Sequence, residues 1–314
     1  MRSRRQTQRV AAVLAAGVLL LGACGYNDTT VPGSQDDATS EAPPAAAPVE
    51  CDNATQSYTP NPDRAAARKQ LKRKGLLVVG VSADTIKLGF ANPFEKFEIQ
   101  GFDIDVARDI AEALDVDLRL EVITAAQRIP LLESGDVDIV VRNMTMNCTR
   151  WEQIGFSAVY YQAAQKVLVR SDDVADFEQR GVASLAKKKV CAPTGSTSID
   201  NITTIEPEAE AVGAPNHTGC LVKFQQGEVD AITGDDTVLA GLAAQDPYAK
   251  VPEQKNLSTE PYGVGVAKDN RDLIAFINSV LDERRENGAW QTSYDTWLKA
   301  YLGDAKPPKP VYGR

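Results

Sequence analysis

Leu76-Leu77-Val78-Val79-Gly80-Val81 is a short apolar run that carries no charge. Apolar residues at helical spacing follow it at 103–114. The alternation continues with a strand at 118–123, a short helix at 128–133 and an apolar strand at 137–141. Strands that alternate with helices in this way predict an α/β sheet with helices on both faces.

A second set of alternating elements predicts a second lobe. Its strands are expected at 189–192, 209–212 and 229–232, and its helices from about 196, at 219–226 and at 236–244. A charged helix at 63–74 precedes the first set, and a strand at 261–267 and helices at 271–286 and 289–301 follow the second. We assign 61–165 and 259–302 to lobe 1, 166–258 to lobe 2, and 303–314 to a loose proline-rich tail. In such sheets ligands bind beyond the carboxyl ends of strands, here the loops after Val81, Val141, Ala192 and Ile232.

The N-terminal residues predict export. Residues 1–23 begin with arginines, continue with an apolar run at 10–21 and end in small residues. The sequence Leu21-Gly22-Ala23-Cys24 resembles a lipobox, in which Cys24 would be acylated and tether the protein to the membrane. An uncleaved anchor and an ordinary secretory signal are the alternatives. Residues 24–60, rich in Ala, Pro and Asp, are expected to form a flexible linker.

Charge and cysteine content exclude several functions. The formal net charge is −9, and without residues 1–23 there are 30 basic and 43 acidic residues, so nucleic-acid binding is not expected. Four cysteines follow Cys24, and an even number in an exported chain predicts two disulfides with three alternative pairings. One histidine and no Cys-x-x-Cys give no basis for a metal or a redox cofactor, and we expect neither.

Three of the strand-end loops carry complementary charge. Arg150 suits a carboxylate because its planar fork donates two parallel hydrogen bonds, although an ion pair with Glu152 is the alternative. The hydroxyls of 193–198 begin a helix and form either an anion site or helix caps. Asp235 or Asp236 could accept from an ammonium group, and one of the two is expected to cap the next helix. Together these loops match an amino-acid zwitterion.

Gly101-Phe102-Asp103-Ile104-Asp105-Val106 resembles the signature of the family 3 extracellular solute-binding proteins, the polar amino-acid receptors of ABC importers. The resemblance spans about 74–302 and is supported by the stretches 127–132, 156–161, 227–231 and 261–264. It implies a two-lobed periplasmic-binding-protein-like (type II) fold, with two sheets flanked by helices and joined by a two-strand hinge. It is most similar to the glutamate/aspartate- and glutamine-binding lipoproteins of Gram-positive bacteria.

The resemblance also implies a function and partners. The chain would be a monomeric binding protein, not an enzyme, anchored by lipid on the extracytoplasmic face of the cell membrane. Between its closing lobes it would capture glutamate, aspartate, glutamine or asparagine for an ABC permease. The alternatives are an amino-acid sensor that reports to a membrane signalling protein and an enzyme on the same scaffold, such as a dehydratase relative.

Site residues follow from the matched motifs. Arg150 would hold the α-carboxylate, Asp235 the α-ammonium, and Arg128 a side-chain carboxylate. The remaining candidates line the pocket: Asn143 and Thr145 from lobe 1, Thr197 and Ser198 from lobe 2, and His217, which is alternatively structural. Ser82 departs from the family pattern, because many relatives have an aspartate there, and this argues against a basic ligand.

For the cysteines, we predict with this resemblance the pairs Cys191–Cys220, within lobe 2, and Cys51–Cys148, which would fasten the N-terminal segment beside the ligand loop. Mixed pairs or free thiols are the alternative.

Overall fold

The structure is a computed structural model that describes residues 51–314, which belong to one compact unit spanning Ala45–Arg314. The expected signal segment, Cys24 and most of the expected linker lie outside the described residues. Within the described part, no helix combines the length and the apolar character needed to cross a membrane.

Lobe 1 is built on a five-stranded sheet in the order β6-β2-β7-β15-β8. β2 pairs in parallel with β6 and β7, and β15 runs antiparallel to β7 and β8. The strands are β2 (Leu76–Val81), β6 (Asp117–Val122), β7 (Ile139–Val140), β8 (Ile154–Phe156) and β15 (Gly265–Ala267). Its helices are α1 (Arg64–Lys69), α2 (Phe102–Leu114), α3 (Arg128–Ser134), α4 (Cys148–Gln153), α9 (Arg271–Glu286), α10 (Ala289–Trp297) and α11 (Lys299–Leu302).

Lobe 2 is built on a sheet in the order β11-β10-β12-β9-β13, with β14 also paired to β9. β10 is parallel to β11 and β12, and β9 is antiparallel to its neighbours. The strands are β9 (Tyr161–Arg170), β10 (Lys189–Pro193), β11 (Glu210–Ala214), β12 (Ala231–Asp235), β13 (Ala249–Lys250) and β14 (Ser258–Tyr262). The helices are α5 (Val174–Arg180), α6 (Thr197–Ile205), α7 (His217–Gln226) and α8 (Asp236–Ala243), with 3-10 turns at Ser171–Asp173 and Gly181–Leu185.

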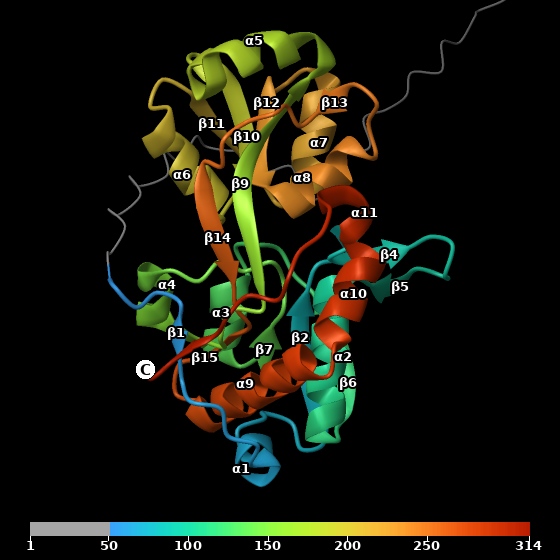
Figure 1. Cartoon of the computed structure of the whole chain (residues 1–314), viewed down its shortest axis with the longest axis vertical. Coiled ribbons are helices and arrows are strands. Elements are labelled where there is room, and N and C mark those ends of the chain that lie inside the picture. The colour runs from blue at the N-terminus through green and yellow to red at the C-terminus, as the bar shows by residue number, and fades with distance from the viewer. Residues whose placement is uncertain (1–50) are drawn as a thin grey trace, which may run out of the picture. The chain divides into compact units, whose positions relative to one another are not determined.

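Two long strands connect the lobes. β9 leads from lobe 1 into lobe 2, and β14 returns beside it (Figure 1). The predicted fold class, two α/β lobes joined by a two-strand hinge, is therefore confirmed. The expected single strand at 261–267 is wrong, because β14 ends at Tyr262 in the hinge and β15 begins at Gly265 in the other sheet.

The signature at 101–106 has a structural reason. Gly101 precedes α2 at φ 138°, and a Cβ there would lie 2.3 Å from the carbonyl oxygen of Leu88, so only glycine fits. Asp103 is buried two residues further on, where its Oδ2 accepts from the backbone N–H of Asn143 at 2.8 Å and its Oδ1 from the hydroxyl of Tyr160 at 2.9 Å. The first turn of α2 therefore fixes the loop that follows β7.

The two ends of the described chain are ordered, contrary to the sequence prediction. β1 (Gln56–Ser57) pairs in parallel with β16 (Val311–Tyr312), so neither the last ten residues of the expected linker nor the expected loose tail is free. Asn278, which is fully buried, donates to the hydroxyl of Ser57 and to the carbonyl of Tyr58. These bonds satisfy backbone and hydroxyl groups that the polar composition alone would leave to water.

Both predicted disulfides are present in the structure. Cys51 is bonded to Cys148 at the start of α4, and Cys191 in β10 is bonded to Cys220 in α7.

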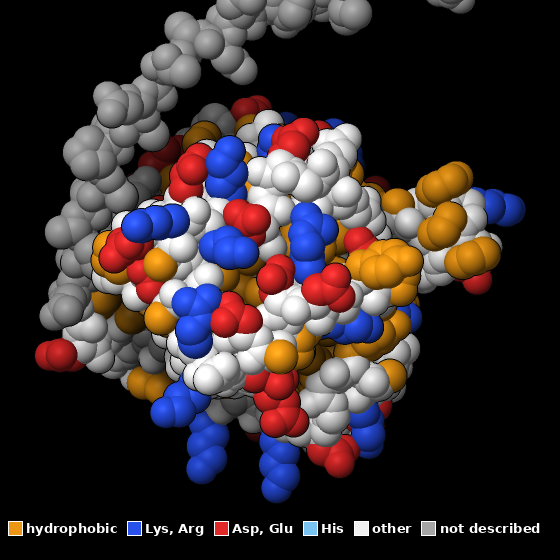
Figure 2. All heavy atoms as spheres, turned by 90° about the horizontal axis from the view of Figure 1, so that it is seen from above, with side chains coloured by type: hydrophobic (Ala, Val, Ile, Leu, Met, Phe, Trp, Pro, Cys, Tyr) orange, Lys and Arg blue, Asp and Glu red, His pale blue; other side chains and the backbone are white. Residues whose placement is uncertain are grey.

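A small three-stranded antiparallel sheet projects from lobe 1. It comprises β3 (Asp84–Thr85), β4 (Gly89–Asn92) and β5 (Glu98–Gln100), and its tip exposes Phe94 and Phe97. Figure 2 shows hydrophobic side chains on this projection, whereas acids and bases are interspersed over the rest of that face.

Candidate functional site

Most predicted site residues meet at one cavity between the lobes. The cavity lies where the loop after β7, the start of α6 and the end of β12 come together. In this arrangement its open space is about 10 Å³, room for roughly one water molecule. Its lining includes seven of the eight candidates, namely Arg128, Asn143, Thr145, Thr197, Ser198, His217 and Asp235.

Asp235 supplies an unsatisfied acceptor to this cavity. The residue is 4 % exposed, and its Oδ2 accepts from the hydroxyl of Tyr262 at 2.5 Å. Its Oδ1 is buried and has no hydrogen-bond partner among the described residues. Burial, and next the charge of Glu260, raise the pKa of Asp235 to about 8. A cation placed against Oδ1 would satisfy the oxygen and favour the ionised carboxylate.

Arg128 lies in the same cavity, at the first residue of α3. Its guanidinium donates to the carbonyls of Ala125, Arg142, Asn143 and Gly195, the last in lobe 2 at 3.1 Å. Burial, followed by the charges of Arg150 and Arg142, lowers the pKa of Arg128 well below its usual value. A carboxylate ligand would relieve this concentration of positive charge.

The structure corrects the expected position of Arg150. Its guanidinium does not line the cavity that contains Asp235; it lines a neighbouring one with Arg128 and Gly195. The reason is local, because its Nη1 donates to the carbonyl of Thr145 at 2.6 Å and its Nη2 to that of Gly195 at 3.3 Å. In the described part of the chain Arg150 forms no ion pair with Glu152 and is only 7 % exposed, so the alternative of a surface ion pair is wrong. These bonds occupy two of its five N–H groups.

Gly195 is the point at which both arginines reach lobe 2. It has φ 77°, and a Cβ there would lie 2.9 Å from the Cα of Ala126 in lobe 1. Glycine thus permits the loop after β10 to approach lobe 1 closely enough for its carbonyl to accept from Arg128 and Arg150.

At the start of α6 the structure shows which hydroxyl caps the helix and which hydroxyls face the cavity, two roles that the sequence did not distinguish. Ser196 is the N-cap, whose hydroxyl accepts from the backbone N–H of Ile199 at 3.3 Å. Thr197 and Ser198 therefore need not cap the helix, and both line the cavity.

Asn143 and His217 complete the lining. Asn143 adopts φ 34°, and its Oδ1 is a second buried oxygen without a partner among the described residues. Nε2 of His217 lies 3.2 Å from the carbonyl oxygen of Thr233, so this nitrogen carries the proton. Burial lowers the pKa of His217 to about 4, which keeps the ring neutral at physiological pH.

Sequence reasoning missed two acidic residues near the cavity. Glu260, in the hinge strand β14, is 2 % exposed and accepts from both Thr145 and Thr197. Asp84 stands two residues after Ser82, accepts from its hydroxyl at 2.8 Å, and has a buried Oδ2 without a described partner. The sequence did contain a signal for Asp84, because it lies only two positions after Ser82, where many relatives have an aspartate.

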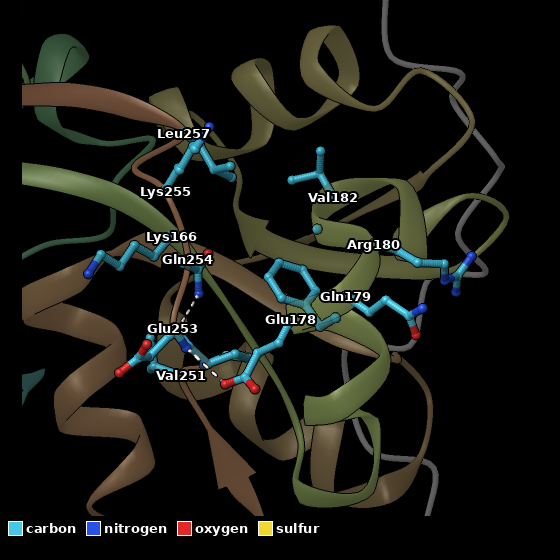
Figure 3. A pocket seen from close by; sticks show the side chains of 13 residues that line it. Lys166, Glu178, Gln179, Arg180, Val182, Val251, Glu253, Gln254, Lys255 and Leu257 are labelled. Atoms are coloured by element: carbon cyan, nitrogen blue, oxygen red, sulfur yellow. Dashed lines mark hydrogen bonds between the residues drawn. The ribbon is translucent and has the colours of Figure 1, made fainter.

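A larger groove of about 1060 Å³ lies elsewhere, on lobe 2 between α5 and residues 251–257 (Figure 3). Arg180, one of its cations, is already paired with Asp176. The backbone N–H of Glu253 donates to Glu178 across it, at 3.3 Å. None of the predicted site residues lines this groove.

Within the described residues, no group of histidines, cysteines and acids could hold a metal ion.

Two α/β lobes, a two-strand hinge and a charged cavity between the lobes define a solute-binding protein. The chain belongs to the bacterial extracellular solute-binding proteins, family 3, whose sequence profile matches residues 77–300. It is therefore a binding protein and not an enzyme.

Relatives cover most of the chain. The ABC transporter glutamine-binding protein GlnH of Bacillus subtilis is 32% identical over 294 residues, which are 92% of this chain and 96% of that protein. The glutamate-binding protein GluB of Corynebacterium efficiens is 28% identical over 231 residues, 69% of this chain and 76% of that protein. The solved structure of an ancestral arginine-binding protein bound to glutamine is 30% identical with a TM-score of 0.67, and covers 74% of this chain and all of its own.

Proposed function

We propose that this protein captures glutamine or glutamate outside the cell and delivers it to the membrane permease of an ABC importer. The observation that carries the proposal is the pairing of opposite charges in one interlobe cavity. Arg128 approaches it from lobe 1, and the unpartnered Oδ1 of Asp235 from lobe 2. GlnH and GluB, whose names state glutamine and glutamate binding, support this choice of ligands.

Each end of a zwitterion has a matching group in this proposal. The ammonium binds Asp235 in lobe 2. The α-carboxylate binds the guanidinium of Arg150, where it takes the place of the carbonyl of Gly195, and Arg128 faces the ligand side chain. A ligand that contacts both lobes stabilises their closed arrangement, which the permease can distinguish from the open one.

The space of roughly one water is too small for an amino acid. Binding in this proposal therefore requires the lobes to separate at β9 and β14 and close again on the ligand. The bonds from Arg128 and Arg150 to the carbonyl of Gly195 are the interlobe contacts that the ligand carboxylate would replace.

The primary test is a thermal-shift screen of the twenty amino acids followed by calorimetry. Glutamine or glutamate should raise the melting temperature, because a ligand that binds only the folded state stabilises it. Asp235→Asn should lose most of this effect. Asp230→Asn is the matched control, since Asp230 precedes β12 at its other end and accepts from the backbone of Lys189. No shift with any amino acid would refute the proposal.

The proposal includes a lipid anchor at Cys24 and a monomer in solution. Cys24→Ala should move the protein from the membrane fraction to the medium, and equal amounts in the membrane for both forms would contradict the anchor. Light scattering of residues 51–314 should give the mass of one chain with and without glutamine.

A further inference from the structure

Glu260 is a buried acid on the hinge strand whose partners come from both lobes. Its Oε2 accepts from the hydroxyl of Thr145 in lobe 1 at 2.6 Å and from that of Thr197 in lobe 2 at 2.8 Å. Its Oε1 accepts from Asn201 at 3.3 Å and from the hydroxyl of Ser258. Four donors around two oxygens are the environment of an ionised carboxylate, which can only accept.

These bonds decide what the two threonines can offer a ligand. A hydroxyl has one hydrogen to donate, and the shortest hydrogen bond of both Thr145 and Thr197 is to Glu260. The Thr197 hydroxyl also lies 3.4 Å from that of Thr145, which is an additional acceptor for it. Towards the cavity, which both residues line, each hydroxyl therefore presents only lone pairs. The free Oδ1 of Asp235 lies in the same lining. This part of the cavity consequently consists of acceptors.

We propose that Glu260 is a specificity-determining residue that makes the cavity favour a side-chain amide over a side-chain carboxylate. This proposal rests on the proposed function, and it states which of the two proposed ligands, glutamine or glutamate, the cavity prefers. A glutamine side chain has N–H groups that satisfy the outward lone pairs of Thr145 and Thr197. A glutamate side chain brings only acceptors to the same surface and adds a negative charge near Glu260, which is unfavourable.

The charge of Glu260 reaches the other groups of the site. It opposes the effect of burial on Arg150, and it acts in the same direction as burial on the pKa of Asp235. An anionic ligand side chain, which Arg128 would attract, would therefore also meet the negative charge of Glu260.

The test is the ratio of glutamine affinity to glutamate affinity, measured by calorimetry in wild type and Glu260→Gln. A glutamine at 260 removes the negative charge, and where its amide nitrogen takes the place of Oε2, the hydroxyls of Thr145 and Thr197 are both released to donate to the ligand. We expect the ratio to fall by about tenfold or more, through gained glutamate affinity. Glu253→Gln is the matched control, because Glu253 is exposed and near the same strand, and its ratio should stay at the wild-type value.

A second variant keeps the inference testable if Glu260→Gln does not fold. Thr197→Val removes one outward acceptor and leaves Glu260 in place, so glutamine affinity should fall more than glutamate affinity. A wild type that binds neither amino acid would refute the proposed function itself. Wild-type binding with the same ratio in both variants would overturn only the role of Glu260.

Discussion

Lowering the pH from 8 to 6 should weaken amino-acid binding about 50-fold, because the ligand ammonium requires an ionised Asp235. The pKa of this carboxyl in the free protein is about 8, raised mainly by burial. Below that value the ligand must displace a proton. Because the carboxyl is already half protonated at pH 8, the two pH units together cost roughly 2 kcal/mol. His217, with a pKa of about 4, stays neutral in this pH range. Asp103, with a pKa of about 6, becomes protonated near pH 6, so the comparison is not extended below that pH.

The same pKa has the opposite effect on the stability of the free protein. Unfolded Asp235 ionises near its ordinary value of 3.8, whereas the folded residue keeps its proton up to about 8. The folded state therefore binds more protons between these values, and this residue's contribution to the free energy of unfolding falls as the pH rises. Ligand affinity and the stability of the free protein should thus change in opposite directions between pH 6 and 8.

Calorimetry at pH 6, 7 and 8, in buffers with different ionisation enthalpies, measures both the affinity and the proton released. Asp235→Asn should bind weakly and without this pH dependence, whereas Asp230→Asn should keep the wild-type slope. Equal wild-type affinity at pH 6 and 8, or an unchanged slope in Asp235→Asn, would refute the reasoning.

Arg150→Ala should weaken binding by about 2 kcal/mol or more, because the carboxylate loses a charged donor; calorimetry with near-wild-type affinity would remove Arg150 from the site. The double variant Cys191→Ser, Cys220→Ser should lower the free energy of unfolding by about 2–4 kcal/mol, and identical guanidinium melts of both forms would contradict this. Asn278→Ala should cost about 2 kcal/mol and speed proteolysis of residues 51–58, since it leaves buried groups unpaired; an unchanged cleavage rate would argue against that fastening.

The regular elements of the fold were predictable because their signals are local. The apolar run at 76–81, the helical spacing in 102–114 and the long helix at 271–286 each depend on neighbours a few positions away. The boundary between β14 and β15 was not predictable from the sequence, because a strand pattern does not reveal which sheet a strand joins.

The site was predictable only as far as strand ends and motifs allow. Seven candidates share a cavity, but the orientation of Arg150 depends on the carbonyl of Gly195, 45 positions away. Glu260 gave no local signal, since its threonine partners lie 115 and 63 positions away. The order of the tail depends on a strand partner about 255 positions earlier, at Gln56. Contacts at such separations follow from the closed fold and not from nearby residues.

The bond between Cys51 and Cys148 also has a mechanical consequence. Any tension applied to the chain ahead of residue 51 reaches this covalent crosslink before it reaches the hydrogen bonds of β1. The load enters lobe 1 at the first residue of α4, two positions before Arg150. Reduction of the crosslink would redirect the same load first into the hydrogen bonds at Asn53 and Ala54 and then into the β1–β16 pairing.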